Sequence, residues 1–141
     1  MKADRVTDGE FKGWLTWASE AFESGAGPFY FRTDEQGVAA AFRAKAKHMN
    51  MGGSVHGGCL MTFADFALFA IAADEIGEGG YGVTVAFTSE FLAGAKEGQL
   101  IESRGEVLRA GGSLLFVRGL VTADGTPCLN YSGTLKRLKP R

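Results

Sequence analysis

The chain has 141 residues and a formal net charge of −1, with acidic and basic residues interspersed. This length fits one domain, residues 1–141, that can bury a core of its own. The charge pattern leaves no basic footprint for nucleic acid and no charge run for an anionic membrane. The first residues lack the apolar run of a secretory signal, so we expect a cytoplasmic protein. Cys59 and Cys128 lie in apolar surroundings, which predicts buried free thiols rather than a disulfide.

The predicted elements begin with an amphipathic helix over residues 8–23, because apolar side chains recur there with helical spacing. These side chains are Phe11, Trp14, Leu15, Ala18 and Phe22. Short strands are expected at residues 29–32 and 38–43. A glycine-rich loop then leads into a helix over about residues 57–76 that is apolar on nearly every side.

The C-terminal half consists of strand-like segments separated by turn signals. These segments are residues 83–92, 100–109, 114–121 and 129–138. Their connections are too short for parallel crossovers, so we expect antiparallel pairing. The apolar helix must be enclosed by other elements. The pattern predicts an α+β domain in which an antiparallel sheet wraps around one long central helix, with a core over roughly residues 29–138 and a helix before it.

Asp65 is the acid within the apolar segment 59–73. A carboxylate in such surroundings costs several kcal/mol unless a partner or a function compensates for it. The glycines before this segment place free backbone N–H groups at a helix start, where the helix dipole favours negative charge. The two features together predict a catalytic pair. The alternative is a structural core acid that is bonded to a backbone group or to a neighbouring helix.

The motif around the helix start resembles the signature of the hotdog-fold acyl-CoA thioesterases, in particular the phenylacetate-degradation subgroup. The matching positions are Asn50, Gly53, His56, Gly57, Gly58 and Asp65. Thr84, on the strand after the helix, fits the Ser or Thr of that family. The resemblance covers roughly residues 35–138. It implies a hotdog fold and the hydrolysis of acyl-CoA or aryl-CoA thioesters, with coenzyme A as part of the substrate and with no separate cofactor.

Thioester hydrolysis needs a donor for the developing oxyanion and a carboxylate that activates water or attacks directly. The Gly57 N–H suits the first role, and Asp65 suits the second as general base or nucleophile. His56 either orients the loop and the carbonyl or only caps the helix. Asn50 either holds the attacking water or only fixes the loop. Thr84 either assists Asp65 or is an ordinary strand residue.

The spacing of Gly57 and Asp65 has a consequence for assembly. Eight residues of one helix separate the two by about 12 Å, whereas a reacting carbon must lie roughly 3 Å from each group. Two antiparallel helices from two chains can bring them together. The resemblance implies the same division, with Asn50, His56 and Gly57 from one chain and Asp65 and Thr84 from its partner. We therefore expect a homodimer, or a tetramer built as a dimer of dimers.

Substrate contacts are predicted at Gly58, Phe66, Phe69 and Arg109. The phenylalanines could line an acyl pocket, although core packing explains them equally simply. Arg109 is a candidate for the coenzyme A phosphates, together with Arg104, Arg118 and Arg137. His48 follows several basic residues and is predicted to be an exposed loop residue.

The cysteine, histidine and acid spacing fits no common zinc pattern, and no phosphate-binding loop is present. Two other functions remain open from the sequence. One is an enoyl-thioester hydratase or dehydratase that uses His56 and Asp65, and the other is a non-catalytic acyl-CoA binding module.

Overall fold

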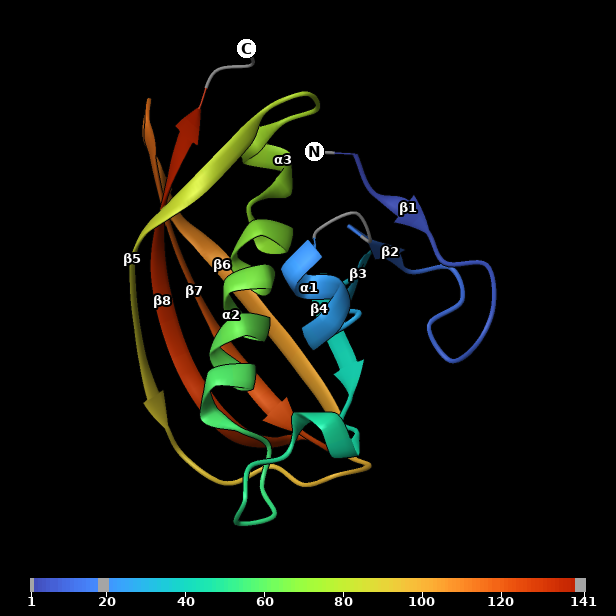
Figure 1. Cartoon of the computed structure of the whole chain (residues 1–141). Helices are drawn as coiled ribbons and strands as arrows, with labels where there is room; N and C mark the ends of the chain where they lie inside the picture. The colour runs from blue at the N-terminus through green and yellow to red at the C-terminus, as the bar shows by residue number, and fades with distance from the viewer. Residues whose placement is uncertain (1, 18–20, 139–141) are drawn as a thin grey trace.

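The computed structural model describes residues 2–17 and 21–138. Within these residues the strands form a single antiparallel sheet in the order β1-β2-β3-β4-β6-β7-β8-β5. The strands are β1 (Asp4–Arg5), β2 (Leu15–Thr16), β3 (Tyr30–Asp34), β4 (Gly37–Arg43), β5 (Tyr81–Phe91), β6 (Leu100–Ala110), β7 (Leu114–Ala123) and β8 (Thr126–Leu138). The sheet curls around one long helix (Figure 1). The predicted hotdog architecture is confirmed.

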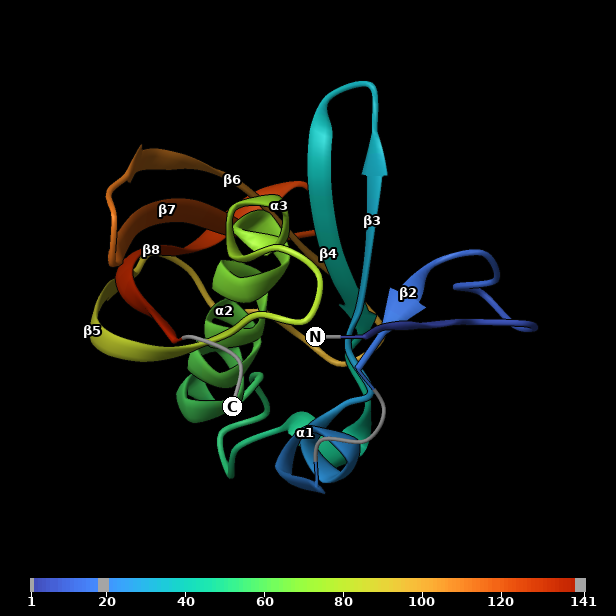
Figure 2. The same ribbon diagram turned by 90° about the horizontal axis from the view of Figure 1, so that it is seen from above.

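The central helix, α2, spans Gly57–Ile71, and a short helix α3 (Ala73–Ile76) follows after a break at Ala72. Seen from above, strands β4 to β8 form an arc around α2, and the β3–β4 hairpin extends beyond it (Figure 2). The helix side chains that enter the arc are buried. The prediction of one enclosed helix over residues 57–76 is therefore correct apart from this break. No helix within the described residues is long and apolar enough to span a membrane.

Glycines in the sheet allow α2 to lie close to it. A Cβ atom at Gly133 of β8 would lie 2.4 Å from Leu68 Cδ1, and one at Gly105 of β6 would lie 2.8 Å from Ile71 Cδ1. Leu68 is fully buried, so it cannot turn outward into solvent. The lack of a side chain at these two glycines therefore determines how closely α2 can approach the sheet.

Aromatic rings fill the space between α2 and strands β3 and β4. Phe29 packs edge-to-face on both Phe42 and Phe63, with ring centroids 5.1 and 5.4 Å apart. Phe66 of α2 contacts Phe29 and Trp17 in the same cluster. Burying each of these rings contributes roughly 1.5–3 kcal/mol. The cluster holds one face of α2, the face turned away from β5, against strands β3 and β4.

The predicted N-terminal helix over residues 8–23 is wrong. Residues 8–13 form turns, residues 15–16 form β2, and the helix in this region, α1, spans only Ala21–Ala26. Gly9 and Gly13 have φ values of 81° and 89°, which a right-handed helix does not allow. Phe11 stacks on Tyr30 of β3 at 4.4 Å instead of facing a helical core. The aromatic spacing therefore reflects packing on a strand, and the predicted position Ala18 lies outside the described residues.

The other strand predictions agree with the structure to within a few residues. The expected strands at 100–109 and 114–121 correspond to β6 and β7, and that at 129–138 begins earlier, as part of β8. Both cysteines are free; Cys128 is buried as predicted, whereas Cys59 is only half-buried.

Candidate active site

The start of α2 leaves one backbone donor unused. His56 is the N-cap residue, and its Nδ1 accepts a 2.9 Å hydrogen bond from the Gly58 N–H. The N–H groups of Cys59 and Leu60 both donate hydrogen bonds to the His56 carbonyl oxygen. The Gly57 N–H has no acceptor among the described residues, although the helix dipole favours negative charge at this end. This N–H can therefore stabilise an oxyanion.

The loop before α2 is held by Asn50. Its Oδ1 accepts hydrogen bonds from the backbone N–H groups of Gly52 (2.9 Å) and Ser54 (3.0 Å). Gly53 within this loop has a φ of 83°, a conformation that side chains rarely adopt. Asn50 and Gly53 therefore shape the turn that carries the chain to His56. The second predicted role of Asn50, holding a water molecule, stays a prediction.

Asp65 and Thr84 meet although 19 residues separate them in the chain. The Thr84 hydroxyl donates a 2.6 Å hydrogen bond to Asp65 Oδ1, which joins β5 to the middle of α2. Asp65 is half-buried, and no described residue donates a hydrogen bond to its Oδ2. The pairing of β5 with β8 shifts register directly after Thr84. Such bulges redirect side chains and are common beside active sites.

Phe91, at the end of β5, lies against Gly57 and was not predicted from the sequence. A Cβ atom on Gly57 would lie 3.1 Å from two ring carbons of Phe91, whose side chain is otherwise exposed. The ring therefore forms one wall beside the free N–H. The contact joins distant segments, so no local pattern in the sequence points to it.

The predicted substrate contacts have different surroundings. Phe66 is buried in the aromatic cluster, whereas Phe69 is half-buried and lies near Gly82 of β5. The Gly58 N–H is already bonded to His56. Arg109 is exposed on β6, where the pairing with β7 shifts register. Its side chain makes no hydrogen bond or ion pair within the part of the chain that is described.

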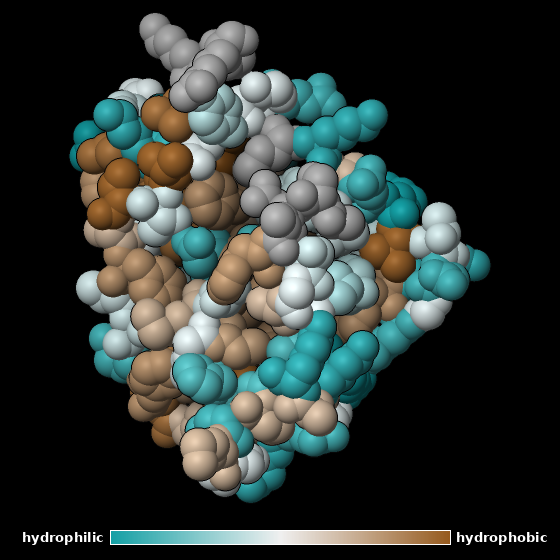
Figure 3. Space-filling model, in the orientation of Figure 1, coloured by the Kyte–Doolittle hydropathy of each residue, from teal (hydrophilic) through white to brown (hydrophobic). Residues whose placement is uncertain are grey.

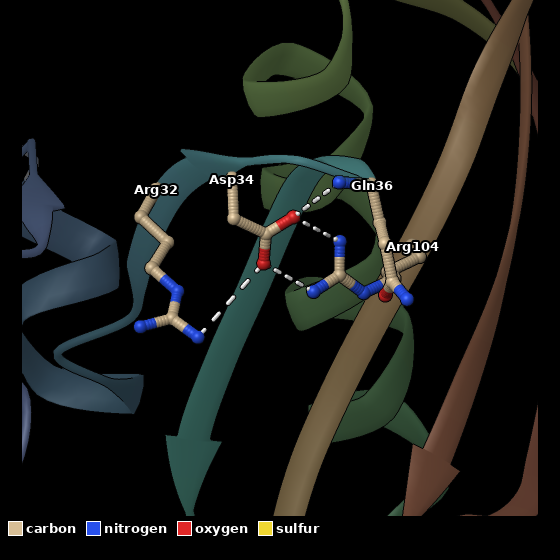
Figure 4. Close-up of polar contacts among 4 residues, drawn as sticks. All are labelled: Arg32, Asp34, Gln36 and Arg104. Atoms are coloured by element: carbon tan, nitrogen blue, oxygen red, sulfur yellow. Dashed lines mark hydrogen bonds and ion pairs between the residues drawn. The ribbon is translucent and has the colours of Figure 1, made fainter.

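The other candidate arginines are bound to the protein itself. Arg104 of β6 forms a bidentate pair with Asp34 of β3, at 3.0 and 2.6 Å, and Arg32 lies 3.9 Å from the same carboxylate (Figure 4). The Arg104 hydrogen bond is the main reason that the pKa of Asp34 falls to about 2. Arg118 pairs with Glu106. Arg104 and Arg118 are therefore bound within the protein, whereas Arg109 has no such partner among the described residues.

Arg137 also bonds within the protein, to the carbonyl oxygens of Glu75 and Gly111. No group of three or more His, Cys, Asp or Glu side chains among the described residues could hold a metal ion.

His48 is buried, and the prediction of an exposed loop residue is wrong. Only 5% of its surface is exposed, and its ring packs edge-to-face on Phe42 with centroids 4.9 Å apart. It belongs to a single 3-10 turn, η1 (Ala46–His48). The preceding basic residues suggested a solvated loop, but the ring turns inward because two backbone groups bind its nitrogens.

Comparison with known proteins agrees with this fold. A model of the thioesterase superfamily matches residues 52–129. The protein named Putative esterase PA0474 from Pseudomonas aeruginosa is 35% identical over 91 residues, which cover 64% of this chain and 68% of that protein. The chain therefore belongs to the thioesterase superfamily and is a thioester hydrolase. The family predicted from the sequence motif is confirmed at this level.

Solved structures share the fold. The PaaI protein from the phenylacetic acid degradation operon of Escherichia coli has a TM-score of 0.74 and 21% identity, covering 88% of each chain. A hypothetical thioesterase protein from Streptococcus pneumoniae, solved with coenzyme A, has a TM-score of 0.70 and 20% identity, covering 80% of this chain and 88% of that one. Both likenesses concern the fold.

Proposed function

We propose that the protein hydrolyses acyl-CoA thioesters to a free acid and coenzyme A. The observation that carries this proposal is the Gly57 N–H at the start of α2, which has no acceptor among the described residues, combined with a half-buried carboxylate, Asp65, on the same helix. The coenzyme A bound to the Streptococcus pneumoniae relative supports the choice of thioester. Arg109, the exposed arginine without a partner in the described chain, is the candidate for a coenzyme A phosphate.

In the proposed reaction the thioester carbonyl oxygen points at the Gly57 N–H. Asp65 takes a proton from a water molecule that attacks the carbonyl carbon, and the oxyanion that forms is held by this N–H. Collapse of the tetrahedral intermediate breaks the carbon–sulfur bond and releases coenzyme A as a thiolate, which takes up a proton. Thr84 occupies Oδ1 of Asp65 and thereby leaves Oδ2 for the water. Direct attack by Asp65, which gives a mixed anhydride, is the alternative route.

The proposed site is shared between two copies of the chain. Gly57 and Asp65 lie on one continuous helix, so about 12 Å of rise separates them within a protomer. β5 forms one edge of the sheet, and unpaired edges favour pairing with another strand. Exposed apolar side chains lie along this edge, at Val83, Val85, Phe91 and Leu92. Brown surface follows the side of the molecule where β5 runs (Figure 3). A second copy that pairs along β5 would place two α2 helices side by side; assembly into a tetramer stays a prediction.

The test is incubation of the purified protein with a panel of aryl-CoA and fatty acyl-CoA thioesters of increasing length, while release of free thiol is followed. We expect thiol release from at least one of them, and the Asp65→Asn variant as matched control should release almost none. An ultraviolet change of an enoyl-CoA without thiol release would instead identify a hydratase. Binding without turnover would identify an acyl-CoA binding module. The preferred acyl group follows from the same panel, and a cytoplasmic location remains the expectation.

A further inference from the structure

We propose that His48 is a positioning residue for the loop before α2. Its ring fastens the start of this loop to the end of α1. Its carbonyl oxygen accepts a hydrogen bond from the backbone N–H of His56, beside the Gly57 donor. This role rests on the proposed function, because it concerns the same oxyanion donor. The ring nitrogens of His48 bond to Lys45 and Ala26 rather than to Gly57 or Asp65, so His48 would act through the loop.

The ring of His48 is held at both nitrogens. The backbone N–H of Lys45 donates a 2.9 Å hydrogen bond to Nδ1, so this nitrogen carries no hydrogen. Nε2 lies 2.7 Å from the carbonyl oxygen of Ala26, at the end of α1, and must donate its hydrogen there. One neutral tautomer, protonated at Nε2, satisfies both partners. The edge-to-face contact with Phe42 fixes the plane of the ring.

The backbone of His48 closes the loop that presents the site. Its carbonyl oxygen accepts a 2.8 Å hydrogen bond from the His56 N–H, and Met49 and Val55 form a bridge immediately inside this closure. The loop between them is the turn that Asn50 shapes. Because His56 directly precedes Gly57, a displacement of His48 would change the direction of the Gly57 N–H.

Lys47 fastens the same turn to α1. Its Nζ donates hydrogen bonds to the carbonyl oxygens of Gly25 (3.1 Å) and Gly27. With the bond from His48 to Ala26, three successive carbonyls at the end of α1 are satisfied by η1. Helix ends leave such carbonyls without partners inside the helix. A shift of η1 would therefore break these hydrogen bonds and leave carbonyl groups at the end of α1 without partners.

The surroundings of His48 favour the neutral ring that these bonds require. Burial lowers the pKa of the His48 imidazole below its ordinary value of 6.5, and the positive charges of Lys47 and Lys45 lower it further, whereas the bond to Ala26 raises it. Other charged or titratable groups line the cavity beside His48 from several elements: Asp8, Glu10, Tyr30 and Arg43. Glu10 is engaged by Arg43.

The test compares His48→Phe, which keeps a ring but has no polar atoms, with His48→Gln, which can place its amide nitrogen near Nε2 and donate to Ala26. We expect kcat of His48→Phe to fall by roughly 10- to 10²-fold, because small displacements of a catalytic group have effects of this size. KM for the acyl-CoA should stay near the wild-type value, because the lost contact acts on the transition state. His48→Gln should recover most of the lost kcat.

Two controls separate positioning from stability and from the proposed function. Val117→Ala removes core volume from β7, away from the loop, and should lower Tm while leaving kcat unchanged. Amide hydrogen exchange gives a readout that does not depend on turnover: His48→Phe should speed exchange of the His56 N–H, and Val117→Ala should not. The chain has only two histidines, so nitrogen-15 spectra of the rings, assigned with His48→Gln, should show His48 as the neutral Nε2–H tautomer at pH 7.

The role of His48 would be overturned by a His48→Phe variant with wild-type kcat and wild-type exchange at His56, or by a doubly protonated ring at pH 7. If the wild-type protein hydrolyses no thioester, the proposed function fails, whereas the exchange experiment still shows whether His48 holds the loop.

Discussion

Thr84 on β5 donates a 2.6 Å hydrogen bond to Asp65 in the middle of α2, and this contact joins the edge strand of the sheet to its central helix. The edge strand therefore does more than complete the sheet, because it also orients one carboxylate oxygen. The second oxygen, Oδ2, accepts no hydrogen bond from any described residue. The same strand ends at Phe91, against Gly57. Both halves of the proposed site thus depend on the position of β5.

Replacing Asp65 by Asn should remove most activity and leave the fold intact. Asn has nearly the same volume and still accepts the Thr84 hydrogen bond, but it cannot act as base or nucleophile. We expect kcat/KM for the best thioester of the panel to fall by about 10²- to 10⁴-fold, with Tm close to that of the wild type. Thr84→Val, which keeps the carboxylate, should have a smaller effect. Retention of more than about a tenth of wild-type turnover by Asp65→Asn would contradict the assigned role.

Gly57→Ala should lower kcat more than it lowers stability. The added methyl group would lie 3.1 Å from the Phe91 ring, so the start of α2 or the ring must move and the donor N–H loses its direction. Loss of one oxyanion donor raises the barrier by about 3–4 kcal/mol. The double variant Gly57→Ala/Phe91→Leu is the matched control, since a smaller side chain at residue 91 relieves the crowding and should restore part of the lost kcat. A normal kcat for Gly57→Ala would mean that the carbonyl is held elsewhere.

Mixing the two inactive variants tests whether the site is shared. In a hybrid dimer of Gly57→Ala and Asp65→Asn, one site carries both substitutions and the other carries neither. Random pairing of equal amounts makes half of the dimers hybrid, so up to about a quarter of wild-type activity should return, given two-fold symmetry. Subunits are exchanged by co-expression or by mild denaturation and refolding. Hybrids that form but stay inactive would place both residues in one site of a single chain.

The Asp34–Arg104 pair should make stability depend on pH in acid. The hydrogen bonds from Arg104 hold the pKa of Asp34 at about 2, below the ordinary value of 3.8. The carboxylate is therefore stabilised in the folded protein, and this contribution is complete above pH 3.8 and is lost as the pH falls through about 2. Asp34→Asn should lower Tm at pH 7, and the difference from the wild type should shrink between pH 4 and pH 2. A difference in Tm that does not change with pH would contradict the assignment.

The sequence predicted the parts of this molecule whose structure follows from local patterns. The apolar helix that begins at Gly57 had to be enclosed, and short connections required antiparallel strands, so the wrapped sheet followed. The residues before Gly57 pointed to a loop and a helix start. The joining of Asp65 and Thr84 in one protomer was implied by the family resemblance.

Most of the differences arise where contacts between distant residues outweighed a local pattern. The apolar residues near Phe11 have helical spacing, but glycines with positive φ and stacking on Tyr30 make turns more stable than a helix there. His48 lies in a basic stretch, yet distant backbone groups draw it inward. Phe91 approaches Gly57 only because β5 passes the end of α2.

The absence of a side chain at Gly133 also limits how this protein can change over evolutionary time. Leu68, which occupies the space of a Cβ atom at residue 133, lies one helical turn after Asp65. A larger residue at position 133 of β8 would push α2 away from the sheet and carry Asp65 away from Thr84. Residues 68 and 133 can therefore change mainly together. A smaller residue at 68 would have to accompany any side chain at 133. Two residues outside the proposed chemistry therefore constrain each other's evolution through the position of one carboxylate.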